Sequence, residues 1–162
     1  MKTWVAVVNR CEARLFELDD HRKKNAGGRL NNKLKLVKKL ENPRGRLRNG
    51  EIDADRPGFS KSSFSYSGTR LAKSQEPTER VAEMFAKSIS EELERAIVDH
   101  QYDDLILVVE PHFLGKVRAE LSKKTSGAIS TTLHKDLVNV PDHQLQDFIW
   151  PKTHEEEVQI NL

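Results

Sequence analysis

Hydrophobic and polar positions in the first part of the chain alternate in the manner of β-strands. Residues 3–9 and 12–18 are short runs rich in Val, Trp and Phe, and they predict the two strands of a hairpin. Around Leu34 and Leu36, lysines alternate with apolar residues, which is the pattern of a third strand with one solvated face. The chain is therefore predicted to begin with antiparallel strands.

The second part of the chain shows helical periods separated by further apolar runs. From Val81 to Ile97, apolar residues recur every four positions after a helix start at Pro77, which predicts an amphipathic helix. Residues 105–109 are uninterruptedly apolar, as in a strand buried on both faces, and we expect this strand at the centre of the sheet. The remaining predicted elements are a helix from Pro111 with Leu114, Val117 and Leu121 on one stripe, a strand over residues 128–133, and a short helix capped by Asp142 and carrying Leu145, Phe148 and Ile149.

A long segment without apolar periodicity, residues 42–77, separates the two parts. Loops longer than about 15 residues are uncommon in compact domains unless they are functional or disordered. The order of elements predicts one α/β domain over residues 1–150: a mixed sheet with antiparallel N-terminal strands, this long basic loop, and then helix, strand, helix, strand and helix. Residues 151–162 are predicted to form an acidic C-terminal tail.

Composition narrows the class of protein. The 162 residues have a mean hydropathy of −0.67 and 32% charged residues, so the surface must be strongly ionic. No apolar run is long enough for a secretory signal or a membrane span, which predicts a cytosolic protein without a membrane partner. The single cysteine excludes an internal disulfide and a zinc site built on several cysteines, and we expect Cys11 to be a buried strand residue.

The net charge of +2 conceals a strong asymmetry. Residues 21–50 hold eleven Lys or Arg and a single acid, Glu41. Such a segment has the charges needed to bind phosphates with release of counterions, although the same charges can simply solvate a hairpin and a loop. Three aromatic residues in the following loop are candidates for stacking on unpaired bases, the alternative being that they pack back on the domain: Phe59, Phe64 and Tyr66.

Few residues suggest catalysis. Glu51, Asp53 and Asp55 place three carboxylates close together, which is suitable for Mg²⁺ or for general acid–base chemistry, but pairing with neighbouring arginines explains them equally well. The histidines lack zinc-ligand spacing, and no dinucleotide, P-loop or serine-hydrolase motif occurs. His112, after the buried strand, is a candidate polar contact or a helix-terminal residue. We therefore predict no metal, no cofactor and no catalytic residue.

Several segments, by their order and spacing along the chain, resemble the bacterial host-attachment family, whose members are named for a requirement in attachment to host cells. These segments are Trp4-Val5-Ala6-Val7-Val8, Ala13-Arg14-Leu15-Phe16, Asn42-Pro43, Asp55-Arg56-Pro57-Gly58, Phe85-Ala86, residues 105–109, Pro111-His112-Phe113-Leu114-Gly115-Lys116-Val117-Arg118 and Lys135-Asp136-Leu137. The family in turn is similar to the middle domain of archaeal and eukaryotic peptide-chain release factors and of Pelota. That similarity implies a release-factor-like α/β domain with a long loop before its first long helix.

In release factors this loop carries Gly-Gly-Gln, which positions water against the peptidyl-tRNA ester. The tripeptide is absent here, since the loop's only glutamine, Gln75, follows Lys73-Ser74. The resemblance therefore implies a cytosolic module that binds the ribosome or ribosomal RNA without releasing peptide. The loop motif would comprise Asp55, Arg56, Pro57, Gly58 and Gly68, and the phosphate contacts would be Arg44, Arg46, Arg48, Arg56, Lys61, Arg70 and Lys73.

Two other functions remain open at this stage. One is a protein–protein interaction factor that acts indirectly in surface or host-cell attachment. The other is a hydrolase or nuclease that uses the acidic loop around Asp53.

Overall fold

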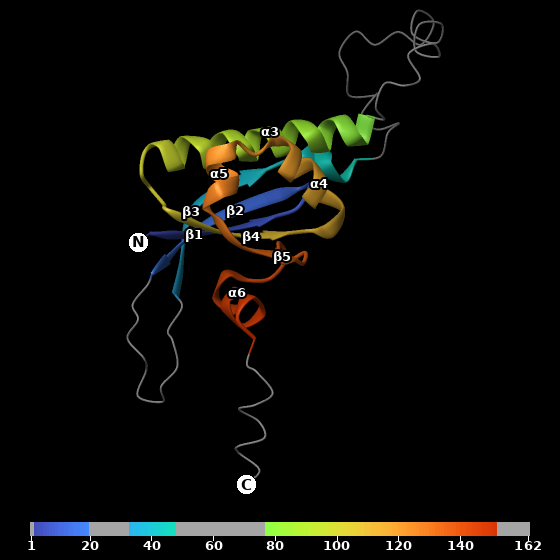
Figure 1. Ribbon diagram of the computed structural model, residues 1–162. Helices are drawn as coiled ribbons and strands as arrows, with labels where there is room; N and C mark the ends of the chain where they lie inside the picture. Colours follow the sequence, from blue (N-terminus) through green and yellow to red (C-terminus); the bar gives the residue numbers. More distant parts are fainter. Residues whose placement is uncertain (1, 20–32, 48–76, 152–162) are drawn as a thin grey trace, which may run out of the picture.

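The computed structural model of the chain describes residues 2–19, 33–47 and 77–151. It shows a five-stranded mixed sheet covered by helices on both faces (Figure 1), which confirms the predicted single α/β domain. The elements are β1 (Thr3–Val8), β2 (Glu12–Asp19), β3 (Lys33–Glu41), the short 3₁₀ helix η1 (Pro43–Arg46), α3 (Pro77–Val98), β4 (Asp104–Val109), α4 (Pro111–Glu120), α5 (Lys123–Ala128), β5 (Ile129–His134) and α6 (Asp142–Ile149).

The sheet has the order β3-β2-β1-β4-β5. β1 pairs antiparallel with β2, and β2 pairs antiparallel with β3, as the N-terminal pattern predicts. β4 pairs parallel with both β1 and β5. The expectation that residues 105–109 form the central strand is wrong: β1 occupies the centre, because the antiparallel strands extend the sheet on its other side.

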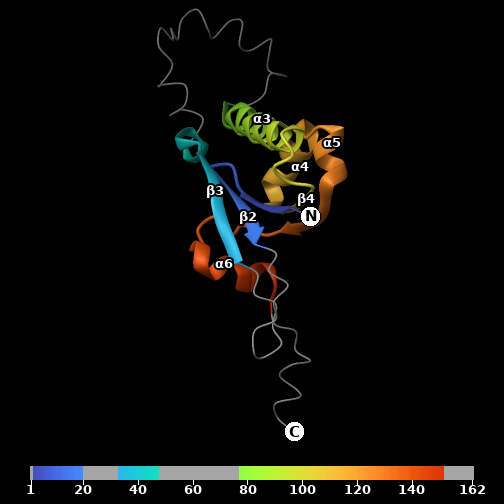
Figure 2. The same cartoon turned by 90° about the vertical axis from the view of Figure 1, so that its left-hand side faces the viewer.

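Two hydrophobic cores lie on opposite faces of the sheet. On one face, Trp4, Ala6 and Val8 pack with α3 and α4. On the other face, Val5 and Val7 pack with α6 and with the segment that precedes it. Figures 1 and 2 show this division, with α3, α4 and α5 on one side of the sheet and α6 on the other. Both faces of β1 are thus buried, which explains its continuous apolar run.

A register shift in β3 changes which of its side chains meet the core. Leu15 pairs with Lys38 but Phe16 pairs with Leu36, so Val37 is an extra residue, a β-bulge. Before the bulge, Leu34 packs in the α6-side core, and after it Leu40 packs in the α3-side core. The six-residue spacing of these leucines would put them on one face of a regular strand.

Several local predictions need correction. Cys11 lies in the β1–β2 turn, partly exposed, because β2 begins only at Glu12. Phe148 is 45% exposed, since only Leu145 and Ile149 of its helix face the core. Asp142 does not cap α6: Pro141 is the N-cap residue, and Asp142 lies in the first turn.

The predicted long loop and the helices after β4 also differ from expectation. β3 continues to Glu41, and the predicted loop opens with η1 rather than with irregular chain. Residues 48–76 and 152–162 lie outside the described residues. In α4, Phe113 and Val117 are buried, whereas the predicted Leu114 and Leu121 are only partly buried against the same core. α5 was not predicted.

Candidate nucleic-acid interface

The carboxyl ends of β1 and β4 lie side by side at one edge of the sheet. The Glu110 amide donates to the Val8 carbonyl at 3.1 Å, so the chain leaving β4 is fixed to the end of β1. The Glu110 carboxylate accepts from the His112 amide at 2.9 Å and thereby caps α4. His112 itself is exposed in the first turn of this helix. Open α/β sheets place ligands at such an edge, where the strand order changes direction.

Asn9 shapes the turn that follows β1. Its side-chain oxygen accepts from the backbone amides of Cys11 and Glu12 at 2.8 and 2.9 Å. Its side-chain nitrogen donates to the Asp136 carboxylate at 3.3 Å, which ties the turn to the chain after β5. The turn between β1 and β2 is therefore held by side-chain hydrogen bonds on both sides.

Arg10, in this turn, hydrogen-bonds to the chain on both sides of residues 48–76. Its guanidinium Nη2 donates to the Thr78 carbonyl at 2.9 Å, at the beginning of α3. Its own carbonyl accepts from Asn42 Nδ2 at 2.9 Å, immediately before η1. A Cβ on Gly45 would lie only 2.3 Å from that carbonyl oxygen, so this close approach requires glycine. One residue thus fixes where the chain leaves and re-enters the sheet edge.

Two of the seven predicted phosphate contacts lie on this edge. Arg44 and Arg46 are both exposed on η1, and no described acidic side chain forms an ion pair with either of them. The other five predicted contacts lie outside the described residues: Arg48, Arg56, Lys61, Arg70 and Lys73. The predicted loop motif also lies outside them: Asp55, Arg56, Pro57, Gly58 and Gly68.

The lysines of β3 are not equally available to a polyanion. Lys38 Nζ lies 2.9 Å from the Glu92 carboxylate of α3, and this hydrogen-bonded pair lowers the pKa of Glu92. Lys39 Nζ lies 2.8 Å from Glu12 and 3.1 Å from Glu41, and hydrogen bonds to both carboxylates raise the pKa of Lys39. The charge count of the sequence therefore overstates the positive charge that this strand presents.

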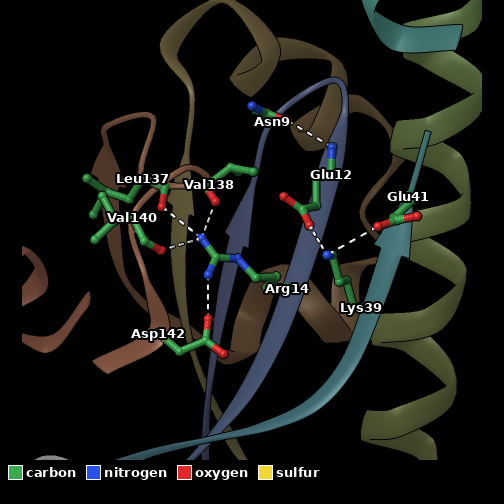
Figure 3. A network of polar contacts seen from close by, with 9 residues as sticks. All are labelled: Asn9, Glu12, Arg14, Lys39, Glu41, Leu137, Val138, Val140 and Asp142. Carbon is green, nitrogen blue, oxygen red and sulfur yellow. Dashed lines mark hydrogen bonds and ion pairs between the residues drawn. The ribbon is translucent and has the colours of Figure 1, made fainter. Parts of the chain in front are cut away.

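A buried arginine on β2 connects the sheet to the chain that leads into α6 (Figure 3). Arg14 is 7% exposed and donates to the Leu137 and Val140 carbonyls at 3.0 and 2.8 Å. It also donates to the Val138 carbonyl and pairs with the Asp142 carboxylate. Because both terminal nitrogens of its guanidinium are engaged by these four partners, Arg14 is a structural residue rather than a ligand contact.

The described residues contain little catalytic chemistry. Across residues 2–19, 33–47 and 77–151, no group of three His, Cys, Asp or Glu side chains is arranged to hold a metal ion. The acidic loop residues Glu51, Asp53 and Asp55 fall outside this part of the chain. The buried hydroxyl of Tyr102 donates to the Leu93 carbonyl at 2.7 Å, and burial raises its pKa to about 12, so it serves packing.

Sequence reasoning did not single out Arg10 or Arg14 as site-shaping residues. The available signal was an arginine inside the apolar run of β2, since a charge that is buried must be paired. Arg10 carried no such signal, because its partners Asn42 and Thr78 come from distant parts of the sequence.

Within the described ranges, no helix combines the length and the apolar character that crossing a membrane requires.

Two comparisons with known proteins bear on the identity of this chain. A search of curated proteins finds no match to it. Residues 4–149 match a family model described as "Protein required for attachment to host cells". This match covers nearly the whole chain and confirms the predicted family: the chain belongs to the family of proteins required for attachment to host cells.

Proposed function

We propose that the protein is a cytosolic ribosome- or RNA-binding module whose basic segment contacts phosphates at the carboxyl edge of β1 and β4. The observation that supports this most directly is the exposure of Arg44 and Arg46 on η1, without acidic partners among the described residues. Guanidinium groups that are exposed and unpaired are suited to bidentate phosphate binding.

The position of η1 strengthens this proposal. Gly45, between the two arginines, is buried against the Arg10 carbonyl, so η1 is fixed to the turn of the β1–β2 hairpin. Less side-chain and backbone entropy is lost on binding when the cations sit on a fixed element. The segment that continues from η1 contributes five further predicted phosphate contacts by sequence.

The proposed module is related to the release-factor middle domain but does not release peptide. The tripeptide Gly-Gly-Gln, which positions the attacking water in release factors, does not occur in the sequence. Incubation with ribosomes that carry peptidyl-tRNA should leave ester hydrolysis at the background rate. Release above background that disappears in a Gln75→Ala variant would contradict this part of the proposal.

The first experiment is co-sedimentation of the full-length protein with bacterial ribosomes at low and moderate salt. The test variant replaces Arg44, Arg46 and Arg48 by Ala. We expect the wild type to co-migrate at low salt and the variant to stay at the top of the gradient. Binding should weaken with added salt by about 0.7–0.9 in log–log slope for each phosphate contacted.

A matched control removes exposed charge elsewhere. Lys123 and Lys124 are exposed on α5, which packs near Glu94, far along α3 from the Thr78 end that Arg10 holds. Arg118 is exposed in the last turn of α4, at the end of that helix away from Glu110. A Lys123→Ala/Lys124→Ala/Arg118→Ala variant loses the same formal charge and should still co-migrate. Equal loss in both triple variants, or a wild type that never co-migrates, refutes the proposed interface.

A second candidate function is an interaction with a protein partner that acts indirectly in attachment. It is favoured by the family description, which names attachment to host cells. An apolar protein interface does not share the steep salt dependence of phosphate binding. Binding of a protein partner that is insensitive to salt and to the arginine substitutions would support this second function instead.

A further inference from the structure

A cavity of about 220 Å³ lies between the C-terminal end of α3 and the edge strand β3. It is at the opposite end of α3 from Thr78, and therefore away from the candidate interface. At about 30 Å³ for each water, this volume corresponds to about seven water molecules, and it is smaller than the pockets of about 300–1,000 Å³ that bind drug-sized ligands. Its size suits a small metabolite. Apolar and polar residues line it: Trp4, Leu15, Val37, Lys38, Glu92, Arg95, Ala96, Asp99 and Gln101.

The β3 wall of this cavity is shaped by the bulge at Val37. Successive residues of a regular strand point to opposite faces. Val37 and Lys38 nevertheless both line the cavity, because the extra residue of the bulge redirects the chain. Val37 stays 43% exposed there and continues the apolar surface that the buried Trp4 and Leu15 form at the base of the cavity.

The α3 wall ends in a turn that breaks two preferences of helix C-termini. The His100 amide donates to the Ile97 carbonyl at 3.1 Å, and the Gln101 amide donates to the Ala96 carbonyl at 2.9 Å. In this Schellman arrangement the left-handed position favours glycine, but His100 occupies it with a φ of 57°. Asp99 directly follows the last helical residue, where the helix dipole favours cations. Both choices cost free energy, and such costs are concentrated at functional sites.

The charged groups of the cavity form a cationic part and an anionic part. Lys38 Nζ and Arg95 Nη1 lie 2.9 and 3.0 Å from the same oxygen of Glu92, so two cations share one carboxylate and one positive charge is in excess. Asp99 is exposed and forms no ion pair with a described residue. Arg95 precedes it by four residues, which makes the two positions neighbours on the helix surface. An unpaired acid therefore lies beside an excess of positive charge.

We propose that this cavity binds a free α-amino acid with an apolar side chain. The ammonium of the amino acid pairs with Asp99, and its carboxylate accepts from Arg95 and Lys38. Its side chain packs on the apolar surface that Trp4 and Leu15 form. An α-amino acid fits because it carries both charges on one carbon, next to a hydrocarbon group, in a molecule of about ten non-hydrogen atoms. Charge-assisted hydrogen bonds at both ends provide the specificity.

The test is an amide NMR titration of the full chain with L-leucine and, separately, with L-phenylalanine, each up to about 20 mM. We expect saturable shifts at residues 37–38 and 95–101 with at least one of the two, and none at residues 110–117. A ligand of this size that makes two ion pairs should have a Kd of about 0.1–5 mM.

Two analogues of leucine separate recognition of both charges from attraction to one. 4-Methylpentanoate lacks the ammonium, and 3-methylbutylamine lacks the carboxylate. Each leaves one charged part of the cavity without a partner, so we expect each to bind at least tenfold more weakly than L-leucine. Equal binding of either analogue would contradict the proposal.

Two acids of the α3 region provide matched variants. Asp99→Asn removes the carboxylate that holds the ammonium and should weaken binding at least tenfold. The same change removes an acid from the helix C-terminus, so it should raise Tm by about 1–3 °C, which separates lost binding from lost folding. Glu91→Gln neutralises an exposed carboxylate of α3 that does not line the cavity, and it should leave binding unchanged.

Three results would overturn the proposal. The first is the absence of saturable shifts with both amino acids up to about 20 mM. The second is a set of shifts that avoids residues 37–38 and 95–101. The third is equal weakening by Asp99→Asn and Glu91→Gln, which would reduce the effect to general electrostatics. None of these outcomes depends on whether the protein binds ribosomes, because the experiment contains no nucleic acid.

Discussion

Replacing Arg14 by Met should destabilise the fold by removing the connection between β2 and the chain that leads into α6. Arg14 donates to the Leu137, Val138 and Val140 carbonyls and pairs with Asp142 (Figure 3). Methionine replaces the aliphatic part of the arginine side chain and lacks the guanidinium, so the loss comes mainly from the hydrogen bonds and the charge.

The magnitude follows from the burial of the partners. A buried carbonyl left without a donor costs about 1–3 kcal/mol, and the contact of the guanidinium with the Phe16 ring, at 5.9 Å, adds about 0.5–1 kcal/mol. Against this, methionine avoids the cost of burying a cation, which amounts to several kcal/mol. We expect a net loss of about 2–4 kcal/mol of unfolding free energy, or roughly 6–12 °C in Tm.

Urea unfolding followed by far-ultraviolet circular dichroism measures this loss, and Asp142→Asn is its control. The Asp142 side chain is 48% exposed, so water replaces much of the interaction and we expect a loss of about 0–1 kcal/mol. A loss below about 1 kcal/mol for Arg14→Met, or equal losses in the two variants, would refute the reasoning that the buried carbonyls carry the effect.

Three further predictions follow from single contacts. Gly45→Ala should lower the free energy of unfolding in urea by about 1–3 kcal/mol, because the new Cβ would meet the Arg10 carbonyl oxygen. Gly115→Ala, whose Cβ would have no atom within 4 Å, should raise it by about 0.5–1 kcal/mol, and the opposite order would contradict the close approach at Gly45. The pKa of Tyr102 rises from 10.0 to about 12 on folding, so the unfolding free energy should fall as pH rises through this range, and the fall should be smaller in Tyr102→Phe; identical pH profiles would refute it. The hydrogen bond from Lys38 lowers the pKa of Glu92, which stabilises the fold above the ordinary pKa of 4.5 and is lost on acidification; Lys38→Met should raise the Glu92 pKa in a carboxyl NMR titration more than Arg95→Met does.

The elements that the sequence predicts well are those whose burial is written directly in their pattern. After their first residues, Thr3 and Asp104, β1 and β4 are apolar at every position because both of their faces are covered. α3 has one buried stripe, so its apolar residues recur at helical spacing from Val81 to Ile97. In each case a single local pattern corresponds to a single packing environment, and no knowledge of the partner is needed.

The elements that the sequence does not predict depend on contacts between distant residues. α5 has the sequence Lys-Lys-Thr-Ser-Gly-Ala, which has no apolar period, and its buried Thr125 donates to the Glu94 carboxylate of α3 at 3.1 Å, 31 residues away. The bulge at Val37 decides which core receives Leu40, and it is defined by the pairing of β3 with β2, about twenty residues earlier in the sequence. Asp142 looks like a helix cap by sequence, but its partner Arg14 lies 128 residues away.

The same distinction applies to the candidate interface. Charge composition predicts that residues 21–50 attract a polyanion, and within this segment the structure shows Arg44 and Arg46 exposed on η1. Lys38 and Lys39 form ion pairs with acids of α3, β2 and β3, whereas no described carboxylate pairs with Lys33 or Lys35. Composition alone does not distinguish these two pairs of lysines. Ion pairing is a property of the folded chain, so the cations available to a ligand are fewer than the sequence suggests.

Arg10 links stability to the proposed function at the edge of the sheet. The chain before η1 and the first turn of α3 are separated by more than thirty residues of sequence, yet both hydrogen-bond to this one residue. Its Nε is buried and has no hydrogen-bond partner among the residues that the structure describes, which costs free energy. A cost of this kind is tolerated where the residue fixes a geometry that cheaper packing would not provide. Here that geometry brings the chain before η1 and the first turn of α3 together beside the carboxyl ends of β1 and β4. Open α/β sheets bind ligands at this kind of edge.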